Sequence, residues 1–320
     1  MGTPPDWLAG AGGRTLVVLG ADGFIGSWVV RLALHAGAHV VGLCVKQPWR
    51  LADLPGERLA LEAVPGGRWW EPAQLDVLAR VLPGATALVH LGYEPPPAGA
   101  DRGAHERAVN VAAAGRVARV AAAAGARIVF ASSADVYGPW HDDPVDESVP
   151  ARPATPYAEA KLAAESLVLA APDACCLRIA TVFGPGELGP RAIPAFVRAL
   201  ADARPATLHG DGADVRDYVG VAEVAAAIVN ATDERVDPPP LLNLGSGVGR
   251  STRAILETVA GALGAEPAAS SVESGRAPSR LVVDAGAARR LLGFAADPGF
   301  ADAVAREARW MLGERDRWPA

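Results

Sequence analysis

The N-terminal part of the chain reads as a strand, a glycine turn, a helix and a second strand. Thr15–Leu19 is a short apolar run rich in β-branched residues, which predicts a buried strand. It leads directly into Gly20–Gly26, then Ser27–Ala36 has helical apolar spacing, and His39–Val45 reads as a second strand. This layout is the one that holds a dinucleotide pyrophosphate at a helix N-terminus. The start of the chain therefore predicts an α/β fold that binds a nucleotide cofactor.

The three glycines of the turn each have a physical role in such a site. Gly20 permits the tight turn, Gly23 lets the backbone approach the phosphates, and Gly26 lets the helix close on the sheet. Their spacing is G-x-x-G-x-x-G, which differs from the G-x-G-x-x-G of most dinucleotide sites. The alternative is that they serve an ordinary loop between a strand and a helix.

A tyrosine and a lysine stand four residues apart in Tyr157-Ala-Glu-Ala-Lys161. Side chains at that spacing share one face of a helix. A phenol has a pKa of about 10 and is a poor proton-transfer group at neutral pH, but an adjacent ammonium favours the phenolate. We therefore expect Lys161 to lower the pKa of Tyr157, so that the tyrosine can move a proton to or from a sugar or alcohol oxygen.

With these motifs the chain resembles an extended short-chain dehydrogenase/reductase, of the branch that acts on nucleoside-diphosphate sugars. The matching segments run almost end to end: Gly20–Trp28, Val89–Gly92, Asn110, Ile128–Gly138, Pro156–Lys161, Leu177–Gly186, Gly210–Val219 and Asn243–Gly247. The resemblance implies that Ser133, Tyr157 and Lys161 carry the chemistry. It also implies that Phe24, Ile25 and Leu91 join the three glycines in binding the cofactor.

The 320 residues and 50% hydrophobic content fit a globular chain with one large core and a smaller lobe. A net charge of −6 argues against the basic surface that binding of nucleic acid requires. The chain contains no apolar run of 18 or more residues, so we expect no membrane span. Met1–Arg14 lacks the charged and then apolar segments of a signal peptide. The spacing of the three cysteines fits neither a disulfide framework nor a metal site: they are Cys44, Cys175 and Cys176. We therefore expect the protein to be located in the reducing cytoplasm.

Strand and helix patterns alternate to about residue 182, which predicts a doubly wound parallel sheet with helices on both faces. The resemblance returns Val221–Gly247 to this domain. We therefore expect residues 1–182 and 221–247 to form the Rossmann domain, and residues 183–220 and 248–320 to form the substrate lobe. In the resembled family an alanine-rich helix, here about residues 101–124, pairs with the Tyr157 helix in a homodimer. The alternative is that this helix packs only on its own sheet.

The sequence after the second strand bears on the choice of cofactor. NAD sites usually place an acid at the end of that strand, to bind the ribose 2′-hydroxyl, and here the position is Cys44. Lys46 and Arg50 follow, and Arg68 replaces a second acid of the family. These bases favour a 2′-phosphate, and so NADP(H). Two alternatives remain open: the charges are solvated loop residues, or NAD is bound without exchange.

Four residues of the later sequence are candidates for contacting the substrate. The segment Gly210–Val219 resembles the family segment whose arginine holds the diphosphate, which assigns that role to Arg216. Thr181 stands where the family usually has asparagine. Arg276 and Arg280 lie displaced from the place of a second family arginine, and either of them could reach the diphosphate.

Asp135 follows Ser133 in the stretch Ser133-Ala-Asp-Val-Tyr-Gly138. Dehydratases of the resembled family tend to have an acid pair there, which protonates the leaving hydroxyl. Ala134 breaks that pair and argues against a 4,6-dehydratase. Asp135 is then either a weak acid of the site or a turn residue.

These features together predict hydride transfer at a sugar carbon of a nucleoside-diphosphate hexose. The expected bases for NADP(H) favour an exchanging cofactor and hence a reductase, such as a 4-ketoreductase of keto-deoxysugars. The alternative is a 4-epimerase that keeps NAD bound. A minor alternative is a catalytically silent NADP(H)-sensing protein, although such proteins typically lose the Tyr–Lys pair.

Overall fold

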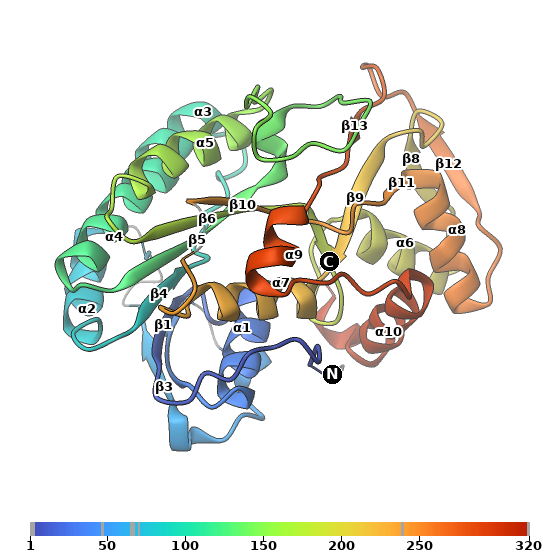
Figure 1. The fold of residues 1–320 in the computed structure, drawn as a ribbon. Coiled ribbons are helices and arrows are strands. Elements are labelled where there is room, and N and C mark those ends of the chain that lie inside the picture. Colours follow the sequence, from blue (N-terminus) through green and yellow to red (C-terminus); the bar gives the residue numbers. More distant parts are fainter. Residues whose placement is uncertain (1–3, 46–47, 65–67, 70, 238–239, 319–320) are drawn as a thin grey trace.

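The computed structural model describes residues 4–45, 48–64, 68–69, 71–237 and 240–318. Its centre is a sheet of seven strands in the order β10-β6-β5-β4-β1-β2-β3, and every neighbouring pair is parallel. Figure 1 shows this sheet running through the larger part of the molecule. The strands are β1 (Thr15–Leu19), β2 (His39–Cys44), β3 (Leu59–Ala63), β4 (Ala87–His90), β5 (Arg127–Ser133), β6 (Ala174–Ile179) and β10 (Leu241–Leu244).

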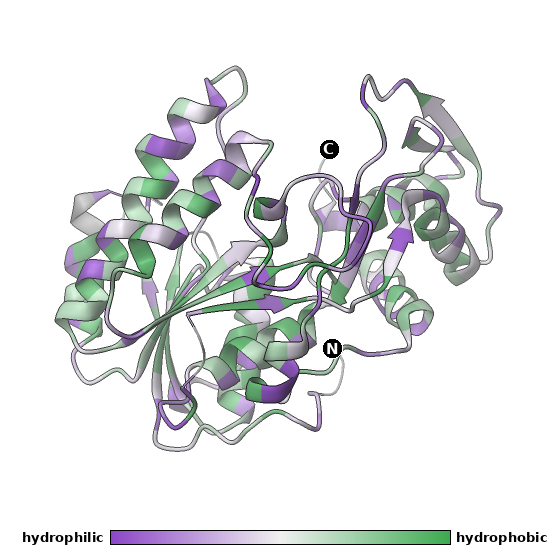
Figure 2. Cartoon of the chain, turned by 45° about the horizontal axis from the view of Figure 1, so that its top comes forward, coloured by the Kyte–Doolittle hydropathy of each residue, from purple (hydrophilic) through white to green (hydrophobic). Residues whose placement is uncertain are grey.

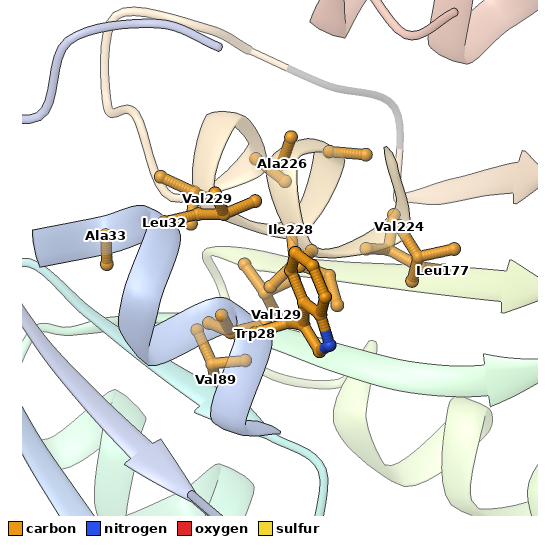
Figure 3. Packing of buried hydrophobic residues seen from close by; sticks show 14 of the residues in the cluster. Trp28, Leu32, Ala33, Val89, Val129, Leu177, Val224, Ala226, Ile228 and Val229 are labelled. Atoms are coloured by element: carbon orange, nitrogen blue, oxygen red, sulfur yellow. The ribbon is translucent and has the colours of Figure 1, made fainter. Parts of the chain in front are cut away.

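Helices cover both faces of this sheet, as the alternating pattern predicts (Figure 1). One face packs on α1 (Phe24–His35), α7 (Val221–Ala231) and α9 (Gly286–Leu292). The other packs on α2 (Pro72–Val81), α4 (Ala112–Ala123) and α5 (Pro156–Val168). Figure 3 shows Trp28 of α1 and Ile228 of α7 packed over strand residues such as Val129. Because both faces are covered, the strands read as nearly continuous apolar runs, and Figure 2 shows them mainly in the hydrophobic colour.

The chain after β6 also forms a smaller region with two short sheets. One contains β11 (Gly249–Ser251), β9 (Val215–Gly220), β13 (Arg280–Leu281) and β7 (Thr181–Phe183), and the other pairs β8 (Ala206–His209) with β12 (Ala269–Val272). The helices α6 (Ala192–Ala201), α8 (Thr252–Leu263) and α10 (Phe300–Gly313) enclose a separate apolar cluster. The fold is therefore the predicted doubly wound α/β sheet with a smaller C-terminal sheet. The exact domain bounds stay a prediction.

The structure differs from the sequence-based elements in two places near the site. The helix expected over residues 101–124 is divided into α3 (Arg102–His105), a π-helical turn (Glu106–Val111) and α4. The strand expected over Ala174–Val182 is divided at Ala180, so that β6 stays in the large sheet and β7 joins the small one. The second break arises because β7 pairs with β9 instead of continuing in the large sheet, and apolar periodicity reports neither break. In the described part of the chain, no helix is long and apolar enough to cross a membrane.

Candidate active site

A cavity of about 620 Å³ lies where the ends of the large-sheet strands meet the small sheet. Residues from the glycine turn, from α5 and from β9 all line it. Of the predicted site residues, the cavity lining includes Gly20, Gly23, Phe24, Ile25, Gly26, Leu91, Ser133, Asp135, Tyr157, Lys161, Thr181 and Arg216. Segments far apart in the sequence thus meet at one site, although their individual roles stay predictions.

The glycine turn forms a cradle on one side of this cavity. Gly20 has a φ of +87°, a conformation that favours glycine. A Cβ atom added to Gly26 would overlap the carbonyl oxygen of Gly20, so only glycine lets α1 approach the turn this closely. Gly23 is the N-cap of α1 and supplies no side-chain cap, which leaves backbone N–H groups of the first turn facing the cavity. Such a helix N-terminus fits the pyrophosphate of a nicotinamide dinucleotide.

Replacing Gly26 by alanine tests this cradle. We expect the free energy of unfolding to fall by about 1–3 kcal/mol, because the new methyl group forces apart backbone that cannot move alone. Nucleotide binding should weaken in parallel. Thermal unfolding and calorimetric titration with NAD measure the two effects.

Gly261→Ala is the matched control, because Gly261 lies within α8 and an added Cβ meets nothing within 4 Å. This variant should keep its NAD affinity and gain up to about 1 kcal/mol of stability. Equal NAD affinity in the two variants would count against the cradle.

The proposed catalytic pair lies on α5, whose start is fixed by local sequence. Thr155 caps the helix by accepting a hydrogen bond from Ala158 N, and Pro156 occupies the first turn, where its missing N–H costs nothing. Tyr157 and Lys161 then face the end of β5. The Lys161 amine donates to the Ala131 carbonyl at 2.8 Å, and its Nζ lies 5.8 Å from the centroid of the Tyr157 ring.

The expectation that Lys161 lowers the pKa of Tyr157 is not met in this structure. Burial, followed by the carboxylate of Asp135, raises the pKa of Tyr157 to about 12, and a hydrogen bond with Ser133 opposes this only in part. Burial also lowers the pKa of Lys161 to about 8, which weakens it as a cation. The expectation considered only the charge of Lys161, whereas desolvation dominates for both groups.

Asp135 and Thr181 both line the cavity, at the ends of two strands. Asp135 lies on a 3₁₀ turn, Ala134–Tyr137, whose cap is the Ser133 hydroxyl accepting from Asp135 N at 3.2 Å. Asp135 is therefore a turn residue that also lines the cavity, and it is exposed. Thr181 opens β7, where the chain passes from the large sheet to the small one.

Among the candidate substrate arginines, the structure places only Arg216 on the cavity. Its Nη1 donates to the carbonyl of its own neighbour, Val215, at 3.2 Å. Arg276 instead pairs with Asp214 at 2.9 Å, and Arg280 Nε donates to the Asp142 carbonyl at 3.2 Å. Neither Arg276 nor Arg280 lines the cavity, because these partners hold both side chains away from it.

Two of the three bases expected to hold a 2′-phosphate are engaged elsewhere. Arg50 donates to the Gly186 carbonyl at 3.0 and 3.1 Å and to the Asp22 carbonyl at 3.2 Å, so it ties the glycine turn to the loop after β7. Arg68 pairs with Glu71 at 3.0 Å on the surface. Lys46 lies outside the described residues. The structure therefore removes much of the basis for predicting NADP(H).

Sequence reasoning did not assign several other residues of the cavity lining to the site, among them Tyr93, Glu187, Arg191 and Tyr218. Glu187 accepts from Gly189 N at 2.6 Å and lies 3.6 Å from the Arg191 guanidinium. Tyr218 is next but one to Arg216 on β9, so strand alternation could have placed it on the same face. Arg191 sits at the N-cap of α6, in a stretch where the sequence carries no matching motif.

The sequence of this chain is similar to those of known enzymes that modify nucleoside-diphosphate sugars. Residues 16–245 match the model of the NAD dependent epimerase/dehydratase family. A UDP-glucose 4-epimerase from Mycolicibacterium smegmatis is 34% identical over 315 residues, which cover 92% of this chain and 96% of the relative. A dTDP-glucose 4,6-dehydratase from Streptomyces griseus is 29% identical over 317 residues and covers 95% of each chain.

Two solved structures are similar over nearly the whole chain. MoeE5 in complex with UDP-glucose and NAD has a TM-score of 0.80 and 29% identity, covering 95% of this chain and 100% of the other. DesIV, a dTDP-glucose 4,6-dehydratase from Streptomyces venezuelae with NAD and TYD bound, has a TM-score of 0.84 and 28% identity, covering 95% and 99%.

Proposed function

The chain belongs to the NAD dependent epimerase/dehydratase family of enzymes, and on that premise we propose that it is a nucleoside-diphosphate-sugar 4-epimerase that keeps NAD bound. This proposal replaces the ketoreductase favoured by the sequence alone. Support comes from the epimerase at 34% identity and from similar structures that hold NAD. Membership among enzymes, together with the Tyr157–Lys161 pair on the cavity, leaves the non-catalytic sensor without support.

The single observation that carries the choice of NAD is the position of Arg50. Its guanidinium makes three hydrogen bonds to main-chain carbonyls, and burial lowers its pKa. These bonds occupy three of its five N–H groups and hold the side chain between the glycine turn and the loop after β7, so a 2′-phosphate could engage the full guanidinium fork only by reorienting it. A cofactor without that phosphate leaves them intact, which favours NAD. The Ala134-Asp135 sequence further favours epimerisation over dehydration, because the second acid of the dehydratase pair is missing.

The residues on the cavity suffice for the proton steps of an epimerase. When bound, NAD supplies reversible hydride chemistry at the sugar carbon. Tyr157 would take the proton of the substrate hydroxyl while the carbon loses its hydride. It would return the proton when the hydride comes back to the opposite face, so that the carbon is inverted without net oxidation. Ser133, which lines the same cavity, would hydrogen-bond the same substrate oxygen. Because the pKa of Tyr157 is about 12, its phenolate needs a nearby cation. We assign that role to Lys161, whose pKa of about 8 leaves it mostly protonated at pH 7 and whose Nζ lies 5.8 Å from the centroid of the Tyr157 ring.

We expect the purified protein to contain NAD and to interconvert 4-epimers without added cofactor. Denaturing the protein and identifying the released nucleotide by mass spectrometry tests the first point. The second is tested by incubation with UDP-glucose, UDP-glucuronic acid and dTDP-glucose, followed by proton NMR of the sugar. Stoichiometric consumption of NADPH would restore the ketoreductase. A 4-keto-6-deoxy product would instead identify a dehydratase.

The homodimer remains a proposal. Leu167 on α5 is 42% exposed, and this apolar residue is one that a second subunit could cover. Size-exclusion chromatography with light scattering measures the state directly.

A further inference from the structure

A buried carboxylate lies behind the proposed catalytic pair. Glu106 is only 3% exposed and opens the π-helical turn Glu106–Val111. One of its oxygens accepts from the Tyr93 hydroxyl at 2.7 Å, and the other accepts from Asn110 Nδ2 at 2.8 Å. Both oxygens of this side chain thus accept a hydrogen bond from a neighbouring side chain, as a carboxylate can. Short π turns within α-helices are rare and occur frequently at functional sites.

A small cavity of about 10 Å³ connects this carboxylate with the lysine. Glu106, Tyr93, Asn110, Lys161 and His90 all line it. Its volume corresponds to about one water molecule. Both ring nitrogens of His90 are buried without a hydrogen-bond partner. Glu106 and Lys161 therefore face a shared, largely desolvated space, where charges interact more strongly than in water.

Tyr93 joins Glu106 to the catalytic tyrosine. Its ring is nearly perpendicular to the Tyr157 ring, with an interplanar angle of 89° and centroids 5.3 Å apart. The Lys161 Nζ lies 5.7 Å from the centroid of the Tyr93 ring. The hydroxyl that Glu106 holds thus belongs to a ring in contact with both members of the pair.

We propose that Glu106 is a positioning residue for Tyr157 and Lys161: its carboxylate holds the lysine as an ammonium, and its hydrogen bond to Tyr93 fixes the ring against which Tyr157 packs. The proposal rests on the catalytic roles given above to Tyr157 and Lys161. It explains how a lysine in a dry site keeps the charge that the phenolate needs. Glu106 is not one of the residues that sequence analysis assigned to the site.

The electrostatics of Lys161 agree in direction. Burial, the largest influence, lowers the pKa of Lys161 to about 8, and Glu106 is the strongest of the groups that raise it again. Glu165, which acts in the same direction, is already bound by Arg178 at 2.8 and 3.0 Å. Burial lowers the pKa of His90 to about 3, so its ring is neutral near pH 7. The other titratable groups that act on Lys161, Tyr93 or Tyr157 are Cys176, Arg102, Asp135 and Arg191.

The composition of the chain allows a direct test, because Lys46 and Lys161 are its only lysines. Protein labelled with ¹³C at the lysine ε-carbon gives two lysine signals, and Lys46→Arg identifies which is which. We expect Lys161 to titrate near pH 8 in the wild-type protein as purified. In Glu106→Gln its pKa should fall by about 1–2, because an opposite charge has been removed. Glu106→Asp keeps the charge and should restore most of the difference.

Glu159→Gln is the matched control, since this exposed carboxylate is two residues from Lys161 on the same helix. Its Lys161 signal should titrate as in the wild type. An unchanged pKa in Glu106→Gln, or an equal fall in Glu159→Gln, overturns the proposal. If Glu106→Gln does not fold, Tyr93→Phe replaces it: the carboxylate loses one hydrogen bond, more of its charge acts on Lys161, and the pKa should rise. No rise would then refute the proposal.

Turnover gives a second readout. Activity that needs the Lys161 ammonium is lost as pH rises through the lysine pKa, so a lower pKa in Glu106→Gln moves the basic limb of the kcat profile to lower pH. A merely structural defect would reduce kcat at every pH without moving that limb. The NMR titration needs no substrate, so it stands even if no nucleotide sugar is epimerised.

Discussion

Tyr157→Phe should lower kcat by about 10²–10⁴-fold, the usual contribution of a positioned proton-transfer group. The phenylalanine ring keeps the packing against Tyr93 and removes only the hydroxyl that exchanges a proton with the sugar. Binding of NAD should change little, because the glycine cradle is untouched. The measurements are kcat with the preferred nucleotide sugar and the amount of NAD retained on purification.

Tyr137→Phe is the comparison for this variant. Tyr137 is fully buried outside the cavity lining, and its hydroxyl donates to Asn243 Oδ1 at 2.8 Å. Loss of that bond should cost about 1–3 kcal/mol of stability, because Asn243 is left with one partner fewer, while kcat stays near wild type. If Tyr157→Phe lost less than tenfold in kcat, Tyr157 would not be the proton-transfer residue.

Arg216→Ala should weaken binding of UDP by about 2–5 kcal/mol, which corresponds to roughly 30- to several-thousand-fold in Kd. Arg216 lines the cavity from β9 of the small sheet, whereas the glycine turn lines it from the end of β1 in the large sheet. Its own hydrogen bond reaches only the adjacent carbonyl, so its other N–H groups can meet phosphate oxygens. Isothermal titration with UDP, and separately with NAD, separates the two sites.

Arg276→Ala provides the contrast. Its guanidinium pairs with Asp214 outside the cavity, so UDP affinity should stay within about twofold of wild type. Equal UDP affinity in Arg216→Ala and the wild type would make Arg216 a structural residue. A large loss in Arg276→Ala would mean that this arginine leaves Asp214 for the diphosphate.

Local sequence was sufficient to place the elements that carry the chemistry. The apolar run Thr15–Leu19 became β1. Gly20 takes the positive φ of a tight turn, Gly23 caps α1, and Gly26 lies in its first turn against the Gly20 carbonyl. Tyr157 and Lys161 share one face of α5 because they stand four residues apart, and Thr155 and Pro156 fix where that helix begins. Each of these features depends on a few neighbouring residues, so the pattern along the chain contains the necessary information.

Elements that depend on distant partners were predicted less well. The π turn at Glu106–Val111 breaks a stretch that looked uniformly helical, and β7 separates from β6 only because β9 pairs with it. Local periodicity does not indicate the hydrogen bonds that Glu106 accepts from Tyr93 and Asn110. It also does not indicate the register between β7 and β9, which lie more than thirty residues apart in the sequence.

The sequence by itself therefore determined the doubly wound sheet, the cofactor turn and the tyrosine–lysine pair, because helix and strand periodicity place side chains on faces. The tertiary structure decided which charges are available to a ligand. Arg50 is held by the Gly186 carbonyl and Arg276 by Asp214, while Arg216 stays on the cavity. It also decided that burial raises the pKa of Tyr157. Desolvation and long-range pairing depend on what surrounds a group in space, which the order of residues along the chain does not express.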